Sequence, residues 1–146
     1  MNTAIIEGSD ILKLIPQRPP IVMVDEFCGM DDKASYTALT VRQDNVFCSN
    51  GYLREPGIIE HMAQSAAARV GYICSMNSQP VPLGYIGSVD KLTIHQLPKN
   101  GSRIQTQISI LQELGGLTLI SAQTTTDGTP IAECRMKIFL DITNEN

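Results

Sequence analysis

One long helical stretch, in a chain otherwise patterned for β-strands, constrains the fold most strongly. From Gly57 to about Met76, apolar side chains recur every three or four residues, which is typical of an amphipathic helix. The stripe consists of Ile59, Met62, Ala63, Ala66, Val70 and Ile73. Small residues around much of the remaining helix would let a curved sheet approach it closely. We therefore expect one buried helix wrapped by a sheet.

The segments after the helix alternate with the period of two that strands require. They cover residues 83–94, 102–113, 117–126 and 129–142. Asp127–Gly128 predicts a tight hairpin between the last two segments. In the last segment apolar and charged residues alternate, so one face should meet solvent. These four segments predict an antiparallel meander.

The residues before the helix predict shorter elements. Ser9 is placed to cap a short helix over residues 10–15, which Pro16 would end. Segments 21–28 and 33–42 predict a pair of strands, and residues 43–56 predict a loop. The predicted fold class is α+β in one domain, residues 1–146.

Composition excludes several classes of protein. A net charge of −4 and a pI near 5.0 argue against nucleic acid as the partner. The N-terminus lacks the pattern of a signal peptide, and no apolar run is long enough to cross a bilayer, so we expect a cytoplasmic protein without membrane insertion. The four cysteines have no metal-binding or redox spacing and predict reduced thiols. With two histidines and no nucleotide-binding loop, no metal and no cofactor are expected.

Glu60 is the residue that most suggests chemistry. It lies in the first turns of the predicted helix, at the margin between the apolar stripe and its surroundings. A carboxylate whose pKa is raised by burial can act as acid or base near neutral pH. The alternative is that its charge only complements the helix dipole, worth ~0.3–1 kcal/mol. Gln64, one turn later, could bond this carboxylate or a bound water, or could be an ordinary buried amide.

Three stretches together resemble a known enzyme family. The helix begins Pro-Gly and continues Glu60-x-x-Ala-Gln, the N-terminal stretch reads LKLIPQRPPIVMVDEF, and residues 89–104 read VDKLTIHQLPKNGSRI. Over about residues 10–142 this order resembles the hotdog-fold 3-hydroxyacyl-(acyl-carrier-protein) dehydratases. The similarity is greatest to a short branch of predicted dehydratases associated with fatty-acid-like, polyene or pigment biosynthesis.

The resemblance implies a hotdog fold, in which an antiparallel sheet wraps around the central helix. It also implies a homodimer or higher even oligomer with sheets joined edge to edge. The implied substrate is an acyl thioester on acyl carrier protein or coenzyme A, from which water is eliminated with Glu60 as acid or base.

The chain departs from this family in the loop before the helix. The family carries a His-Phe-Pro-Gly segment there, whose histidine is the base, whereas residues 47–57 (FCSNGYLREPG) contain no histidine. Tyr52, preceded by Asn50 and Gly51, occupies roughly that place. Tyr52 is therefore a candidate donor to the leaving oxygen, and Asn50 a candidate substrate-binding residue.

Other residues could complete the site. His61 lies ~100° around the helix from Glu60, so we expect it either at a subunit contact or in a catalytic role contributed across a dimer. His95, at a strand end, could supply the missing imidazole or could simply be satisfied by backbone. Backbone N–H groups at Gly57 could hold the thioester oxygen, or Pro-Gly could be only a loop-to-helix joint. The candidates for docking an acidic carrier protein are Arg18, Arg54 and Lys99, which could equally be ordinary scattered surface charges.

Two other functions remain open. A helix carboxylate without the loop histidine could serve a hotdog acyl thioesterase, which releases free acid and thiol. The missing histidine also fits a non-catalytic acyl-binding subunit that pairs with an active dehydratase.

Overall fold

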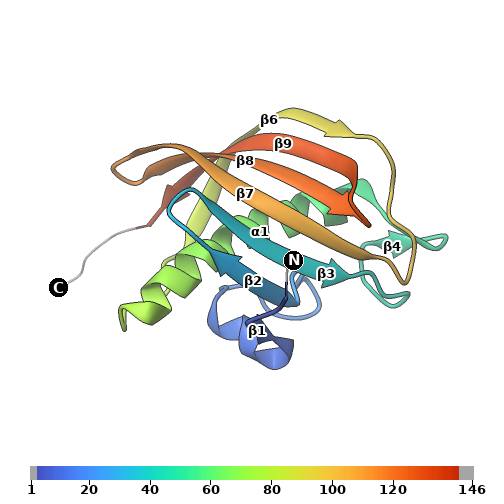
Figure 1. Cartoon of the computed structure of the whole chain (residues 1–146), viewed down its shortest axis with the longest axis horizontal. Coiled ribbons are helices and arrows are strands. Elements are labelled where there is room, and N and C mark those ends of the chain that lie inside the picture. The colour runs from blue at the N-terminus through green and yellow to red at the C-terminus, as the bar shows by residue number, and fades with distance from the viewer. Residues whose placement is uncertain (1–2, 142–146) are drawn as a thin grey trace.

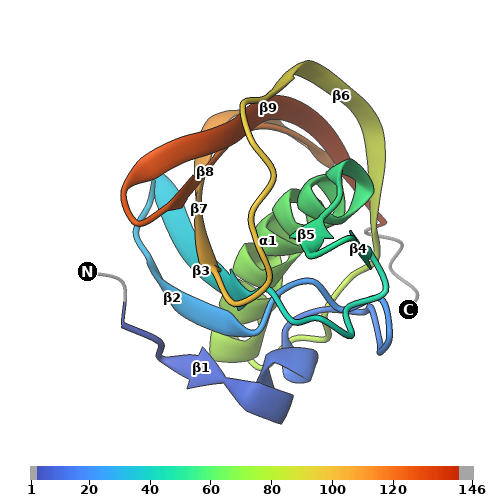
Figure 2. The same cartoon turned by 90° about the vertical axis from the view of Figure 1, so that its right-hand side faces the viewer.

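The computed structural model, which describes residues 3–141, is a long helix wrapped by a curved antiparallel sheet (Figures 1 and 2). The elements before the helix are β1 (Ile6–Glu7), the 3-10 helix η1 (Gly8–Lys13), β2 (Glu26–Met30), β3 (Ala34–Thr40), β4 (Cys48–Ser49) and β5 (Tyr52–Leu53). The helix α1 (Glu55–Met76) is followed by β6 (Gly84–Ile94), β7 (Arg103–Leu114), β8 (Leu117–Thr126) and β9 (Thr129–Leu140). The predicted α+β hotdog arrangement is confirmed. The predicted extension of the last strand to residue 142 lies outside the described residues.

The strand order corrects the predicted meander. The large sheet runs β1-β2-β3-β7-β8-β9-β6, so only β7, β8 and β9 are sequential neighbours after the helix. Strand β6 pairs with β9, while β7 pairs with β3. The connection after β6 bonds to the β4–β5 hairpin, where Leu53 N–H donates to the carbonyl of Pro98 at 3.0 Å. Because this connection runs past the hairpin, β7 pairs with β3 instead of with β6.

Helix α1 begins at Glu55 rather than at Gly57, with Pro56 in its first turn. Proline suits this position because its missing N–H would have no partner inside the helix. A Cβ at Gly57 would lie 2.6 Å from Leu53 Cδ1 and 2.7 Å from Phe47 Cβ. The glycine therefore lets the helix start against the hairpin.

The helix packs on two sides. Ile58, Met62 and Ala66 pack with the inner face of the sheet, in a core that includes Ile108 and Met136. On the other side, Ala68 belongs to a second cluster with Ile11, Leu14, Ile15, Val24 and Phe27. The sheet and the N-terminal segment thus enclose much of α1.

The predicted strand over residues 21–28 is mostly wrong, because β2 begins only at Glu26. Side chains of α1 take the place of a neighbouring strand for the backbone of Ile21 and Met23. The predicted Ser9 cap is also wrong, since η1 starts at Gly8 and has no side-chain cap.

The predicted Asp127–Gly128 hairpin is confirmed. Both residues have positive φ (50° and 79°), the combination that a two-residue turn between twisted strands favours. The solvent face of β9 is also confirmed: Cys134 and Met136 are buried, whereas Arg135 and Lys137 are exposed. Within residues 3–141, no helix combines the length and apolarity needed to cross a membrane.

Candidate functional site

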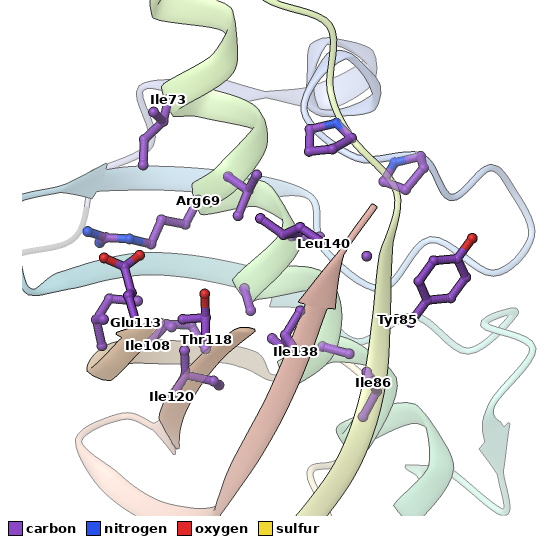
Figure 3. Close-up of a pocket in the computed structure, with 18 of the residues that line it drawn as sticks. Arg69, Ile73, Tyr85, Ile86, Ile108, Glu113, Thr118, Ile120, Ile138 and Leu140 are labelled. Atoms are coloured by element: carbon purple, nitrogen blue, oxygen red, sulfur yellow. The ribbon is translucent and has the colours of Figure 1, made fainter. Parts of the chain in front are cut away.

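An apolar pocket of about 440 Å³ lies between α1 and the inner face of the sheet (Figure 3). The helix contributes small and branched side chains: Ala63, Ala66, Ala67, Val70 and Ile73. The facing strands contribute Ile86, Ile108, Ile110, Ile120, Ile138 and Leu140. Much of the predicted apolar stripe therefore lines an accessible pocket instead of a sealed core, and Ile73 is 37% exposed.

Glu60 lies at this pocket and is held by one neighbour. Its side chain is half-buried, and Gln64 Nε2 donates to Glu60 Oε2 at 2.7 Å. No ion pair to Glu60 is present among residues 3–141. A carboxylate is thus fixed beside apolar surface without a neutralising cation.

Gln64 is fully buried and fixed in orientation by the backbone. Its Oε1 accepts from the N–H of Met23 at 2.6 Å, and its Nε2 also donates to the carbonyl of Ile21 at 2.9 Å. Because the amide oxygen is occupied by a donor, the amide nitrogen must face Glu60. The predicted bond to Glu60 is confirmed, and the alternative of a buried structural amide holds as well.

His61 follows Glu60 in the sequence. Its side chain is completely buried and contacts different groups. Its Nδ1 lies 2.7 Å from the carbonyl of Met23, and its Nε2 lies 2.8 Å from Thr106 Oγ1. A carbonyl can only accept, so Nδ1 carries the proton and the Thr106 hydroxyl donates to Nε2. Burial lowers the pKa of His61 to about 4, against the opposing bond to Met23. The expectation that His61 lies at a subunit contact is wrong, because its own chain covers it.

The other predicted groups lie outside the pocket. His95 is about half exposed, with Nε2 3.3 Å from Glu133 Oε1. Tyr52, 38% exposed, and Asn50, also exposed, belong to the β4–β5 hairpin and its turn. Of the predicted side chains, only Gln64 is brought to Glu60 within one chain.

The backbone at Gly57 is already engaged. Its N–H donates to the carbonyl of Arg54 at 2.9 Å, so it is not free for a ligand oxygen in this structure. The close packing of Gly57 against Leu53 and Phe47 explains its role as the joint between loop and helix.

Two residues of the pocket were not predicted from the sequence. Gln17 lines the pocket, and its buried Oε1 has no hydrogen-bond partner. Arg69 also lines it and is 7% exposed. The sequence feature that could have indicated Arg69 is its place in the middle of a helix, directly after a run of small residues.

Metal ligands do not gather anywhere in residues 3–141. No group of three or more histidine, cysteine or carboxylate side chains there could hold a metal ion.

The enclosed helix and the sheet wrapped around it, with a carboxylate at an apolar pocket between them, define a hotdog-fold protein. The model of the ApeP-like family, described as ApeP dehydratase, matches residues 9–144, and the chain belongs to this family.

Curated relatives agree with this family. The chain is 24% identical over 139 residues to the 3-hydroxyacyl-[acyl-carrier-protein] dehydratase FabZ of Pasteurella multocida, covering 92% of this chain and 91% of that protein. It is 28% identical over 138 residues to FabZ of Syntrophotalea carbinolica, covering 90% and 92%.

Solved structures share the fold. The dehydratase heterocomplex ApeI:P from Xenorhabdus doucetiae aligns with a TM-score of 0.84 at 18% identity, covering 90% of each chain. A hypothetical thioesterase with coenzyme A from Streptococcus pneumoniae aligns with a TM-score of 0.65 at 10% identity, covering 82% of this chain and 88% of that one.

Proposed function

We propose that this protein eliminates water from 3-hydroxyacyl thioesters carried by acyl carrier protein or coenzyme A. The observation that carries the proposal is the Glu60 carboxylate, held by Gln64 beside an apolar pocket that can take an acyl chain. The dehydratase family supports the reaction, and the names of the FabZ relatives support the substrate class. Fatty-acid-like chains, including those of polyenes and pigments, are the proposed products.

In the proposed reaction the proton at C2 leaves to a base, the C2–C3 double bond forms, and the C3 hydroxyl departs as water after receiving a proton. Ionised Glu60 can accept the C2 proton, and protonated Glu60 can return a proton to the hydroxyl. The bond from Gln64 engages Oε2 of Glu60 and leaves Oε1 for the substrate. Gln64 itself cannot turn, because Met23 N–H holds its oxygen.

A second proton-transfer group is proposed to come from across a subunit interface. Neither histidine of this chain lines the pocket. Strand β6 forms one edge of the large sheet, and its exposed apolar residues suit pairing with another copy. We therefore include a homodimer, or higher even oligomer, in the proposal. Exposed Arg18, Arg54 and Lys99 are proposed to attract the acidic carrier.

Replacing Glu60 tests the reaction. Glu60→Gln should lower the rate of enoyl thioester formation by ~10²–10⁴-fold, because the amide keeps the shape but can neither accept nor return the proton. Glu55→Gln is the matched control: it removes a carboxylate from the first turn of the same helix, outside the pocket, and should keep wild-type turnover. Equal turnover in wild type and Glu60→Gln would remove the proposal. Free acid and thiol, in place of enoyl thioester, would assign the protein as a thioesterase.

A second candidate is a non-catalytic acyl-binding subunit that pairs with an active dehydratase. It is favoured by the absence of an imidazole from the pocket lining of the described chain. The same assay decides it: the purified chain would be inert on 3-hydroxyacyl thioesters, and turnover would appear only when a histidine-bearing hotdog dehydratase is co-purified with it.

A further inference from the structure

A buried arginine in the pocket wall has an unused donor. Arg69 Nη2 donates to the carbonyls of Asp31 (3.0 Å) and Asp32 (3.1 Å), in the turn between β2 and β3. Its Nη1 is buried and has no hydrogen-bond partner. Since Arg69 is 7% exposed and Nη1 itself is buried, little water is available to satisfy that nitrogen.

Unsatisfied buried donors are costly and therefore uncommon. Burial lowers the pKa of Arg69, with Glu113 acting in the opposite direction, but a guanidinium remains protonated in proteins. A charged side chain with an unpartnered N–H thus belongs to the wall of a pocket whose other residues are mostly apolar. Arg69 therefore gives this part of the pocket a positive charge and an unpartnered hydrogen-bond donor.

The surroundings of Arg69 specify what could satisfy it. Glu113 and Thr118 line the same part of the pocket, and Figure 3 shows the Glu113 carboxylate and the Arg69 guanidinium on the same side, with Ile108 and Ile120 nearby. The two charged groups are not within ion-pair distance among the described residues. An anionic ligand group would meet the charge of Glu113, whereas a neutral hydroxyl can accept from Arg69 and donate to Glu113 or Thr118.

Arg69 is also far from the proposed reaction centre. It follows Glu60 by nine positions, which corresponds to roughly 14 Å along the helix axis at 1.5 Å per residue. Both residues line one continuous pocket. A thioester beside Glu60 would therefore bring the distal part of its acyl chain toward Arg69.

We propose that Arg69 is a specificity residue that binds a neutral oxygen, such as a hydroxyl, on the distal part of the acyl chain. The inference rests on the proposed function for the placement of the thioester. It predicts that the pocket discriminates against a plain alkyl end.

Binding of matched ligands tests this inference. The probes are two alkyl thioethers of pantetheine with chains of equal length, one ending in methyl and the other in hydroxyl. They resist hydrolysis because they lack the thioester carbonyl. A series of lengths is measured by titration calorimetry. At the best length the wild type should bind the hydroxyl probe about tenfold more tightly, because a hydrogen bond to a charged group replaces an unsatisfied donor.

Substitutions assign the preference to Arg69. Arg69→Met should remove the preference for the hydroxyl probe, and Arg69→Lys, which keeps the charge but loses the forked donors, should reduce it. Arg135→Met is the control, since Arg135 is exposed on β9 and outside the pocket, and it should keep the wild-type ratio. Thermal melting checks that each variant is folded, and Arg69→Lys decides if Arg69→Met does not fold.

Equal binding of the two probes by the wild type, or tighter binding of the methyl probe, would overturn the inference. A preference retained in the folded Arg69 variants would overturn it too. The proposed function fails separately: if plain 3-hydroxyacyl thioesters are dehydrated in a Glu60-dependent reaction without any preference for a distal hydroxyl, only the specificity inference is lost.

Discussion

At the scale of single residues, the adjacent side chains of Glu60 and His61 have different surroundings, because successive residues lie ~100° apart around a helix. Glu60 meets the pocket, whereas His61 joins the helix to the Met23 segment and to Thr106 of β7. Thr106 lies 2.6 Å from Thr124 Oγ1, so a buried polar chain crosses into β8. The Glu60–Gln64 pair was predictable because i,i+4 neighbours are set by the helix alone. The partners of His61 were not, because they lie 38 and 45 residues away in sequence.

The buried His61 should make stability depend on pH. Its folded-state pKa is about 4, below the ordinary value of 6.5. Between these values the unfolded chain binds a proton that the folded chain does not, so stability falls as pH drops from about 6.5 to about 4. The total loss from this group is about 3 kcal/mol and levels off below pH 4. Urea unfolding across this range should show a steeper decline for the wild type than for His61→Gln. Parallel curves would contradict the prediction.

At the scale of elements, backbone pairing that depends on distant side chains limited what the sequence could predict. The helix, β3 and the last three strands follow from local periodicity and turn residues, as at Asp127–Gly128. Residues 21–25 have strand-like composition, yet Gln64 and His61 supply hydrogen bonds that a neighbouring strand would otherwise supply. The pairing of β6 with β9 likewise depends on where the connection between β6 and β7 docks, which period-two alternation does not reveal.

The contact between α1 and the N-terminal segment should tolerate no side chain at Gly71. A Cβ there would lie 1.8 Å from the carbonyl oxygen of Leu14, a backbone atom that cannot move alone. Gly71→Ala should therefore lower the free energy of unfolding by about 1–3 kcal/mol, or more if the helix and η1 separate. Gly84→Ala is the matched control, because its nearest contact would be an ordinary 3.4 Å to Leu140 Cδ2. Equal denaturation midpoints for the two variants would show that the contact adapts.

At the scale of the whole molecule, edge strand β6 of the large sheet offers unpaired backbone groups with which another chain can pair. Strand β6 is 11 residues long and pairs only with β9 among the described strands. Tyr85 is 56% exposed on this edge strand, and Ile86, Leu92 and Phe139 are exposed on β6 and β9. Long apolar edges are a recognised hazard for uncontrolled association, and proteins that keep them usually cover them. This edge also adjoins the pocket, which Tyr85 and Ile86 line.

Substituting the edge tests this account of assembly. Tyr85→Lys places a cation on each copy of β6, so two edges would meet with like charges and lose an aromatic anchor. The wild type should have a dimeric or higher even molecular mass by light scattering, and the Tyr85→Lys dissociation constant should rise at least tenfold, giving monomer at low micromolar concentration. Leu114→Lys is the control: Leu114 is more exposed, at 63%, but lies at the end of β7 beside the β7–β8 turn, and its substitution should leave the mass unchanged. A monomeric wild type, or a Tyr85→Lys variant that keeps the wild-type mass, would show that β6 is not the joining edge. The second proton-transfer group would then have to come from another surface or from bound water.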